Sequence, residues 1–142
     1  MLVQNIFLLE SLELEFTSGL NVLTGETGAG KSILLDCLGY LLGKKNTRIE
    51  LSSQANSAVI IGEFQIQQNG VISQFLSEKG FSVEDNLILR QSIGANRKRR
   101  AFLNDLPCSL DMVRQLGDLM LDLNGQFEEQ GLLNVNTHRA LL

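Results

Sequence analysis

The stretch Gly25-Glu26-Thr27-Gly28-Ala29-Gly30-Lys31-Ser32 matches the pattern G-x-x-x-x-G-K-[ST] in full. Its glycines permit a tight turn in which consecutive backbone N–H groups face one anion. Such a loop opens a helix, whose unpaired N–H groups attract phosphate. Lys31 can reach the β- and γ-phosphates, and the Ser32 hydroxyl can join the shell of a bound Mg²⁺. We therefore predict that residues 25–32 bind ATP together with Mg²⁺.

The sequence on either side of this loop fits the same prediction. Leu20-Asn21-Val22-Leu23 has the pattern of a short buried strand before the loop. Apolar residues then recur at helical spacing from Ile33 to Leu42, and Gly43 stands where a C-cap glycine belongs. A chance match would arise in about half a per cent of random chains of this length. The strand–loop–helix context argues against chance.

Other segments alternate between strand and helix patterns. The opening alternates in a strand-like way at Ile6 and Leu8 and then at Leu12, Leu14 and Phe16. Further strands are predicted over 58–66, over 87–93, and over 101–103, the last antiparallel to 87–93. Asn69-Gly70 predicts a turn, followed by a short helix that Gly80 ends. Ser109 predicts the N-cap of the next helix. The expected fold is α/β, a P-loop NTPase with a mixed sheet that includes antiparallel strands.

Composition places the chain among ordinary globular domains. Its 142 residues are 44% hydrophobic and 20% charged, with a net charge of −4. No apolar run reaches the ~18 residues that a membrane span needs, and no cationic segment precedes the apolar start. The two cysteines, Cys37 and Cys108, suggest buried thiols in a reducing compartment. We expect a cytoplasmic protein whose contacts with nucleic acid are restricted to a local patch.

Several blocks of sequence resemble one family. SGLNVLTGETGAGKSILLDCLGYLLG, RAFLNDLPCSL, LGDLMLDLNGQFEEQGLL and HRALL follow in the order found in the N-terminal part of RecN. RecN proteins are bacterial DNA-repair ATPases of the SMC-like branch of the ABC ATPases. Their ATPase head is split, with a long coiled coil between an N-terminal half that carries the phosphate loop and a C-terminal half. The resemblance implies that residues 1–142 form one N-terminal half-head that ends where the coiled coil begins.

The resemblance also implies partners. The C-terminal half of the same head would complete the fold, and a second head would join through ATP bound between the two. DNA, as double-strand ends or single strands, is the implied target, in double-strand-break repair and recombination, with the protein associated with the bacterial nucleoid. No membrane partner is expected.

Gln126 acquires a role from the same resemblance. It lies in Asn124-Gly125-Gln126, which resembles the Q-loop, where a glutamine helps to coordinate Mg²⁺ and the attacking water. RecN proteins tend to have histidines around this glutamine, whereas this chain has Asn124, Phe127 and Glu129. A polar surface turn is the alternative. Lys31 and Gln126 are thus the candidate catalytic residues, and Ser32 and Gln126 the candidate metal ligands.

Three motifs of a complete ABC-type head do not occur in the sequence: the Asp-Glu pair, the signature motif and the switch histidine. Leu119-Met120-Leu121-Asp122 superficially resembles a Walker B strand. However, Leu123 follows where a catalytic glutamate belongs, so Asp122 is better interpreted as a structural aspartate at a strand end. We expect almost no hydrolysis by this chain alone.

The run Arg97-Lys98-Arg99-Arg100 is the one concentrated group of cations. It is either a solvated hairpin tip or a contact for DNA phosphates. Lys45 and Arg48 follow the first helix, where SMC-like heads place a basic loop, but surface solubility explains them equally well.

We assign no catalytic or metal-binding role to the remaining candidate residues. His138 has no partners for a triad or a metal site, and Cys37 and Tyr40 are interpreted as packing residues.

Two other functions remain open at this stage. A self-sufficient small P-loop enzyme, such as a kinase or a GTPase-like switch, would turn over alone and use Asp122. A docking fragment would bind DNA or a partner and keep the phosphate loop as a passive site.

Overall fold

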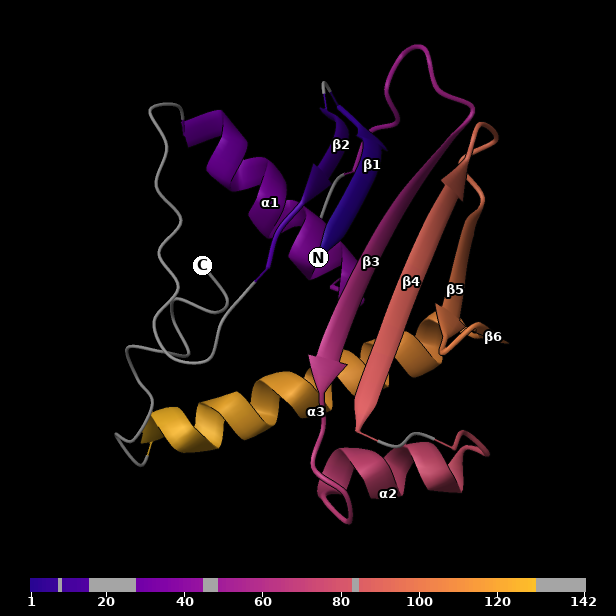
Figure 1. The fold of residues 1–142 in the computed structure, drawn as a ribbon. Helices are drawn as coiled ribbons and strands as arrows, with labels where there is room; N and C mark the ends of the chain where they lie inside the picture. Colours follow the sequence, from indigo (N-terminus) through magenta and orange to yellow (C-terminus); the bar gives the residue numbers. More distant parts are fainter. Residues whose placement is uncertain (8, 16–27, 45–48, 83–84, 130–142) are drawn as a thin grey trace.

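The computed structural model describes residues 1–7, 9–15, 28–44, 49–82 and 85–129, and for 9, 28–32 and 122–129 it describes the backbone alone. Its described strands form one sheet of six, in the order β2-β1-β3-β4-β5-β6, with every pairing antiparallel (Figure 1). The strands are β1 (Leu2–Ile6), β2 (Leu9–Glu13), β3 (Ser57–Gln65), β4 (Asn86–Gly94), β5 (Arg99–Leu103) and β6 (Leu106–Cys108). The predicted strand at Leu20–Leu23 lies outside the described residues.

One face of this sheet forms the core. The long β3–β4 pairing sets Ile60 opposite Gln91, and Gln91 in turn lies opposite Ala101 of β5. Because side chains alternate along a strand, this register places Leu87, Leu89, Gln91 and Ile93 on the same face. All of these positions are buried, and helices α1 and α3 contribute Cys37, Leu41, Val113 and Leu116 to the same cluster.

Helix α1 (Gly28–Leu41) packs against β3 and β4 and ends as the sequence predicts. Gly43 has φ +79°, and the N–H groups of Gly43 and Lys44 donate to the carbonyls of Tyr40 and Gly39. This is a Schellman motif, which needs the left-handed backbone that glycine adopts without strain.

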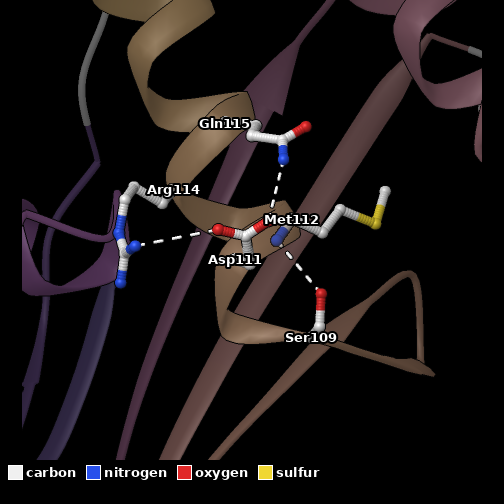
Figure 2. Close-up of polar contacts among 5 residues, drawn as sticks. All are labelled: Ser109, Asp111, Met112, Arg114 and Gln115. Carbon is white, nitrogen blue, oxygen red and sulfur yellow. Dashed lines mark hydrogen bonds and ion pairs between the residues drawn. The ribbon is translucent and has the colours of Figure 1, made fainter.

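Helices α2 (Val71–Glu78) and α3 (Leu110–Glu129) complete the described elements. Gly80 follows α2 with φ +86°, as predicted. Ser109 caps α3: its Oγ accepts a hydrogen bond of 3.1 Å from the Met112 N–H, beside an Asp111–Arg114 ion pair of 3.7 Å (Figure 2). The predicted N-cap is confirmed.

The structure corrects two expectations about the end of the described chain. The segment 119–123 was expected as a strand and Asn124–Gln126 as a loop, but α3 continues without a break through Glu129. The core contains two residues of α3 at helical spacing, Val113 and Leu116, and Met120 packs against it one turn later. This apolar spacing favours a helix, not a strand, over residues 113–120. Strand β6 was not predicted.

Neither of the long described helices combines the length and the apolar character that crossing a membrane requires, so no spanning helix exists among the described residues.

Candidate nucleotide-binding site

The backbone of Gly28–Ser32 forms the first turn of α1, while Gly25, Glu26 and Thr27 lie outside the described residues. The first N–H groups of any α-helix have no partner within the helix, and its dipole favours negative charge there. In this turn Gly28 and Gly30 carry no side chain, Lys31 supplies a cation and Ser32 a hydroxyl. This donor set fits a magnesium-bound triphosphate.

Gln126 lies on the last turns of α3, not on a loop. The structure describes its backbone alone, so the predicted approach of Gln126 to Lys31 and Ser32 stays a prediction. Asp122 also lies within α3, which removes the strand that a Walker B motif requires.

The backbone just beyond the end of α1 lies against α3. A Cβ atom added to Gly117 would stand 2.0 Å from the carbonyl oxygen of Leu42. A Cβ added to Gly43 would stand 2.9 Å from the Cα of Arg114. Glycine at both positions therefore lets the backbones touch. The contact links the helix with the phosphate loop to the helix that carries Gln126.

The C-terminal carbonyls of α1 are bound by side chains from the β4–β5 hairpin. The Gln91 amide donates from Nε2 to the carbonyls of Tyr40 and Leu41, at 2.9 Å in both cases. Arg99 donates from Nη2 to the Tyr40 carbonyl at 2.7 Å and from Nε to the Gln91 amide oxygen. The Arg99 guanidinium also stacks on the Tyr40 ring, 3.6 Å from its centroid. We call Gln91, Arg99 and Tyr40 the α1 anchor.

Burial shifts the pKa values of groups at and near this anchor. It lowers the pKa of Arg99, although the nearby Tyr40 opposes the change, and it raises the pKa of Tyr40. Burial, assisted by the charge of Asp36, raises the pKa of Cys37 to about 11. The Cys37 thiol therefore stays protonated at neutral pH, as a packing residue should. Cys108 is also a free thiol, and burial raises its pKa.

The α1 anchor was missed in the sequence. Tyr40 was interpreted as packing only, and Gln91 was passed over as a strand residue. One signal was available: Gln91 interrupts the alternation of Leu87, Leu89 and Ile93 with a polar side chain on the apolar face. A buried amide requires hydrogen-bond partners, and here the partners are the carbonyls of α1.

The four residues of the basic run 97–100 differ in their exposure to solvent. Arg97, Lys98 and Arg100 are exposed around the β4–β5 turn, where Arg97 has φ +60°. Arg99 is only partly exposed, and its guanidinium donates hydrogen bonds to Gln91 and Tyr40, so its side chain is not simply solvated; a contact of Arg99 with DNA stays a prediction. Lys45, Arg48 and His138 lie outside the described residues.

Comparison with known proteins places this arrangement in a family. The family model described as "AAA domain" matches residues 1–126. The DNA repair protein RecN of Rickettsia bellii is 34% identical over 140 residues, covering 99% of this chain and 25% of that protein. RecN of Bacillus subtilis is 32% identical and matches 99% of this chain and 24% of its own length. The chain thus spans about a quarter of the curated relatives that it matches.

Solved structures share the fold at low sequence identity. A chain from a study of ATP-driven dimerization and DNA-stimulated activation of SMC ATPases has a TM-score of 0.59 and 16% identity, covering 81% of this chain and 74% of its own. The Smc head domain with a coiled coil and joint from Pyrococcus yayanosii has a TM-score of 0.60 and 18% identity, covering 81% of this chain and 24% of its own. The chain therefore belongs to the AAA domain family, as a RecN-like N-terminal region with the fold of an SMC ATPase head.

Proposed function

We propose that this chain is the ATP-binding N-terminal half of a split ATPase head that acts in DNA double-strand-break repair. The observation that carries the proposal is the placement of Gly28–Ser32, the end of a complete phosphate-loop motif, as the first turn of α1. The backbone amides of the loop and Lys31 would hold the triphosphate, and Ser32 and Gln126 would offer oxygens to Mg²⁺. When bound, Mg²⁺ would neutralise phosphate charge.

Hydrolysis requires groups that this chain does not supply. Its sequence has no Asp-Glu pair and no signature motif, which in this class come from the C-terminal half and from a second head. ATP then joins two heads, and hydrolysis releases them, which couples nucleotide state to the arrangement of DNA or coiled coil.

A mixing experiment tests the split head. We expect negligible phosphate release by the chain alone and steady-state turnover after addition of the C-terminal half of a RecN-type head. The matched control is the same mixture with Lys31→Ala, which should stay inactive. Turnover by the chain alone would instead show a self-contained enzyme. A chain that binds no Mg-ATP at all would leave only the docking fragment.

We include contact with DNA in the proposed function because of the exposed cations around the β4–β5 turn. Arg97, Lys98 and Arg100 gather three exposed cations on one hairpin of a chain with a net charge of −4. Such a local patch attracts phosphates although the protein as a whole is acidic.

We expect the triple variant Arg97→Gln/Lys98→Gln/Arg100→Gln to bind oligonucleotides more weakly at low salt. The slope of log affinity against log salt should fall by about 2–3, roughly one for each phosphate contact removed. Fluorescence anisotropy with a blunt duplex and a single strand measures this slope for both forms of DNA. The control is Lys79→Gln, an exposed cation on the C-cap of α2. An unchanged slope would show that the patch is only a solvated hairpin tip.

A further inference from the structure

The C-terminal end of α1, opposite to the phosphate loop, has hydrogen-bond partners for its last carbonyl groups. The last carbonyls of an α-helix lack partners within the helix and carry partial negative charge. In α1 the Schellman motif serves Gly39 and Tyr40, and Gln91 and Arg99 add three further hydrogen bonds to the carbonyls of Tyr40 and Leu41. The three hydrogen bonds from Gln91 and Arg99 join residues separated by 50 to 59 positions in the sequence.

The chemistry of the α1 anchor matches its place at a helix C-terminus. Gln91 is 1% exposed, and both its amide nitrogen and its amide oxygen are used. Arg99 brings a positive charge to the negative end of the helix dipole and fixes the Gln91 amide by donating to its oxygen. Because the guanidinium is a planar fork, it reaches the Tyr40 carbonyl and the Gln91 oxygen at the same time.

α1 is one continuous helix of 14 residues between this anchor and the phosphate loop. Lys31 and Tyr40 are separated by about 13.5 Å along its axis, since each residue adds ~1.5 Å. A helix this short moves as a rigid unit, so a change of tilt at Tyr40 moves the first turn as well. Displacements of about 1 Å at a phosphate-binding group are enough to weaken its interactions with the ligand markedly.

We infer that Arg99, with Gln91, is a positioning residue for the phosphate loop: it sets the affinity for Mg-ATP by fixing α1 on the β4–β5 hairpin. This inference rests on the proposed function, because it concerns the same nucleotide site. It assigns to Arg99 a role distinct from that of Arg97, Lys98 and Arg100, which flank it in the basic run but are exposed. A ligand on the hairpin and a nucleotide on α1 are thereby connected through one set of hydrogen bonds.

The test measures Mg-ATP affinity by calorimetry for the 142-residue chain and four variants. Arg99→Gln removes the fork, Arg99→Lys keeps the charge without the fork, and Gln91→Met removes the amide while keeping the length. The matched control is Arg90→Gln. Arg90 lies next to Gln91 in β4, faces the opposite side of the sheet and stacks on Phe102 at 4.2 Å, so its loss removes the same charge and a similar ring contact.

We expect Arg99→Gln, Arg99→Lys and Gln91→Met each to raise the Kd for Mg-ATP by about five- to tenfold, and Arg90→Gln to change it less than about twofold. Hydrogen exchange on the nucleotide-free chain gives an independent reading. The amides of Gly43 and Lys44, which close the Schellman motif, should exchange faster in the three anchor variants and not in the control.

Other results would overturn the inference. Equal affinity for Mg-ATP in the wild type and the anchor variants would show that the anchor is purely structural, while the proposed function stands. Recovery by Arg99→Lys would show that charge alone acts. An equal loss in Arg90→Gln would attribute the effect to general destabilisation. A wild-type chain without affinity for Mg-ATP would overturn the proposed function, and this inference with it.

Discussion

Gly117→Ala is expected to lower the free energy of unfolding by about 2 kcal/mol, measured by urea denaturation. The new Cβ would stand 2.0 Å from the Leu42 carbonyl oxygen, so α1 and α3 have to move apart. Overpacking against side chains typically costs ~1–3 kcal/mol, and a rigid backbone places this contact at the upper end. The gain of about 1 kcal/mol from replacing glycine within a helix offsets part of the loss.

The matched control for this prediction is Asp118→Ala, at the adjacent exposed position of α3. It also introduces alanine into α3 but does not enter the contact, and should raise the free energy of unfolding by no more than about 0.7 kcal/mol. A higher urea midpoint for Gly117→Ala than for the wild type would show that the two helices are not in backbone contact. In that case α3 would not be fixed relative to the phosphate loop.

Local features of the fold were predictable because a short stretch of sequence specifies them. The end of α1 at Gly43, the turn at Asn69-Gly70 and the cap at Ser109 each depend on residues within about five positions of one another. The pairing of 87–93 with 101–103 was also predictable, since the two strands are joined by a short polar turn.

Strand β6 escaped prediction for a different reason. It has only three residues, one of them Pro107, so it shows neither the length nor the alternation that indicates a strand. Its position follows from the turn before it, where Asn104 and Asp105 both have positive φ, at 45° and 66°. Asn and Asp are the residues other than glycine that most readily adopt this backbone, and two in succession form the tight turn of a hairpin.

The α1 anchor and the length of α3 depend on contacts that are distant in sequence. Gln91 lies 51 residues from Tyr40, and nothing close to it in the sequence indicates that a helix end will lie beside it. In α3 the weak helix formers Asn124 and Gly125 suggested a break, yet the helix continues to Glu129. Packing of Val113, Leu116 and Met120 on the core stabilises α3, and this tertiary contribution outweighs local propensity.

Lys31 gives the clearest test of the nucleotide site because its removal should not harm the fold. Lys31 lies in the first turn of α1, where a cation is unfavourable beside the positive end of the helix dipole. Alanine has the highest helix propensity, so Lys31→Ala should leave the free energy of unfolding without nucleotide unchanged or slightly higher. A loss of Mg-ATP binding in this variant can then be attributed to the missing Lys31 side chain and not to unfolding.

Lys31→Ala is expected to raise the Kd for Mg-ATP by about 100-fold or more in calorimetric titration. The ammonium group makes charge-assisted hydrogen bonds to phosphate, and losing them costs about 3 kcal/mol, which corresponds to that factor. Lys79→Ala removes the same charge from an exposed position on the C-cap of α2, where Nζ lies 5.7 Å from the Phe75 ring centroid, and should leave the affinity unchanged. If both variants bound Mg-ATP as tightly as the wild type, the triphosphate would not be held by residues 25–32. The amides of this loop would then serve only to begin a helix.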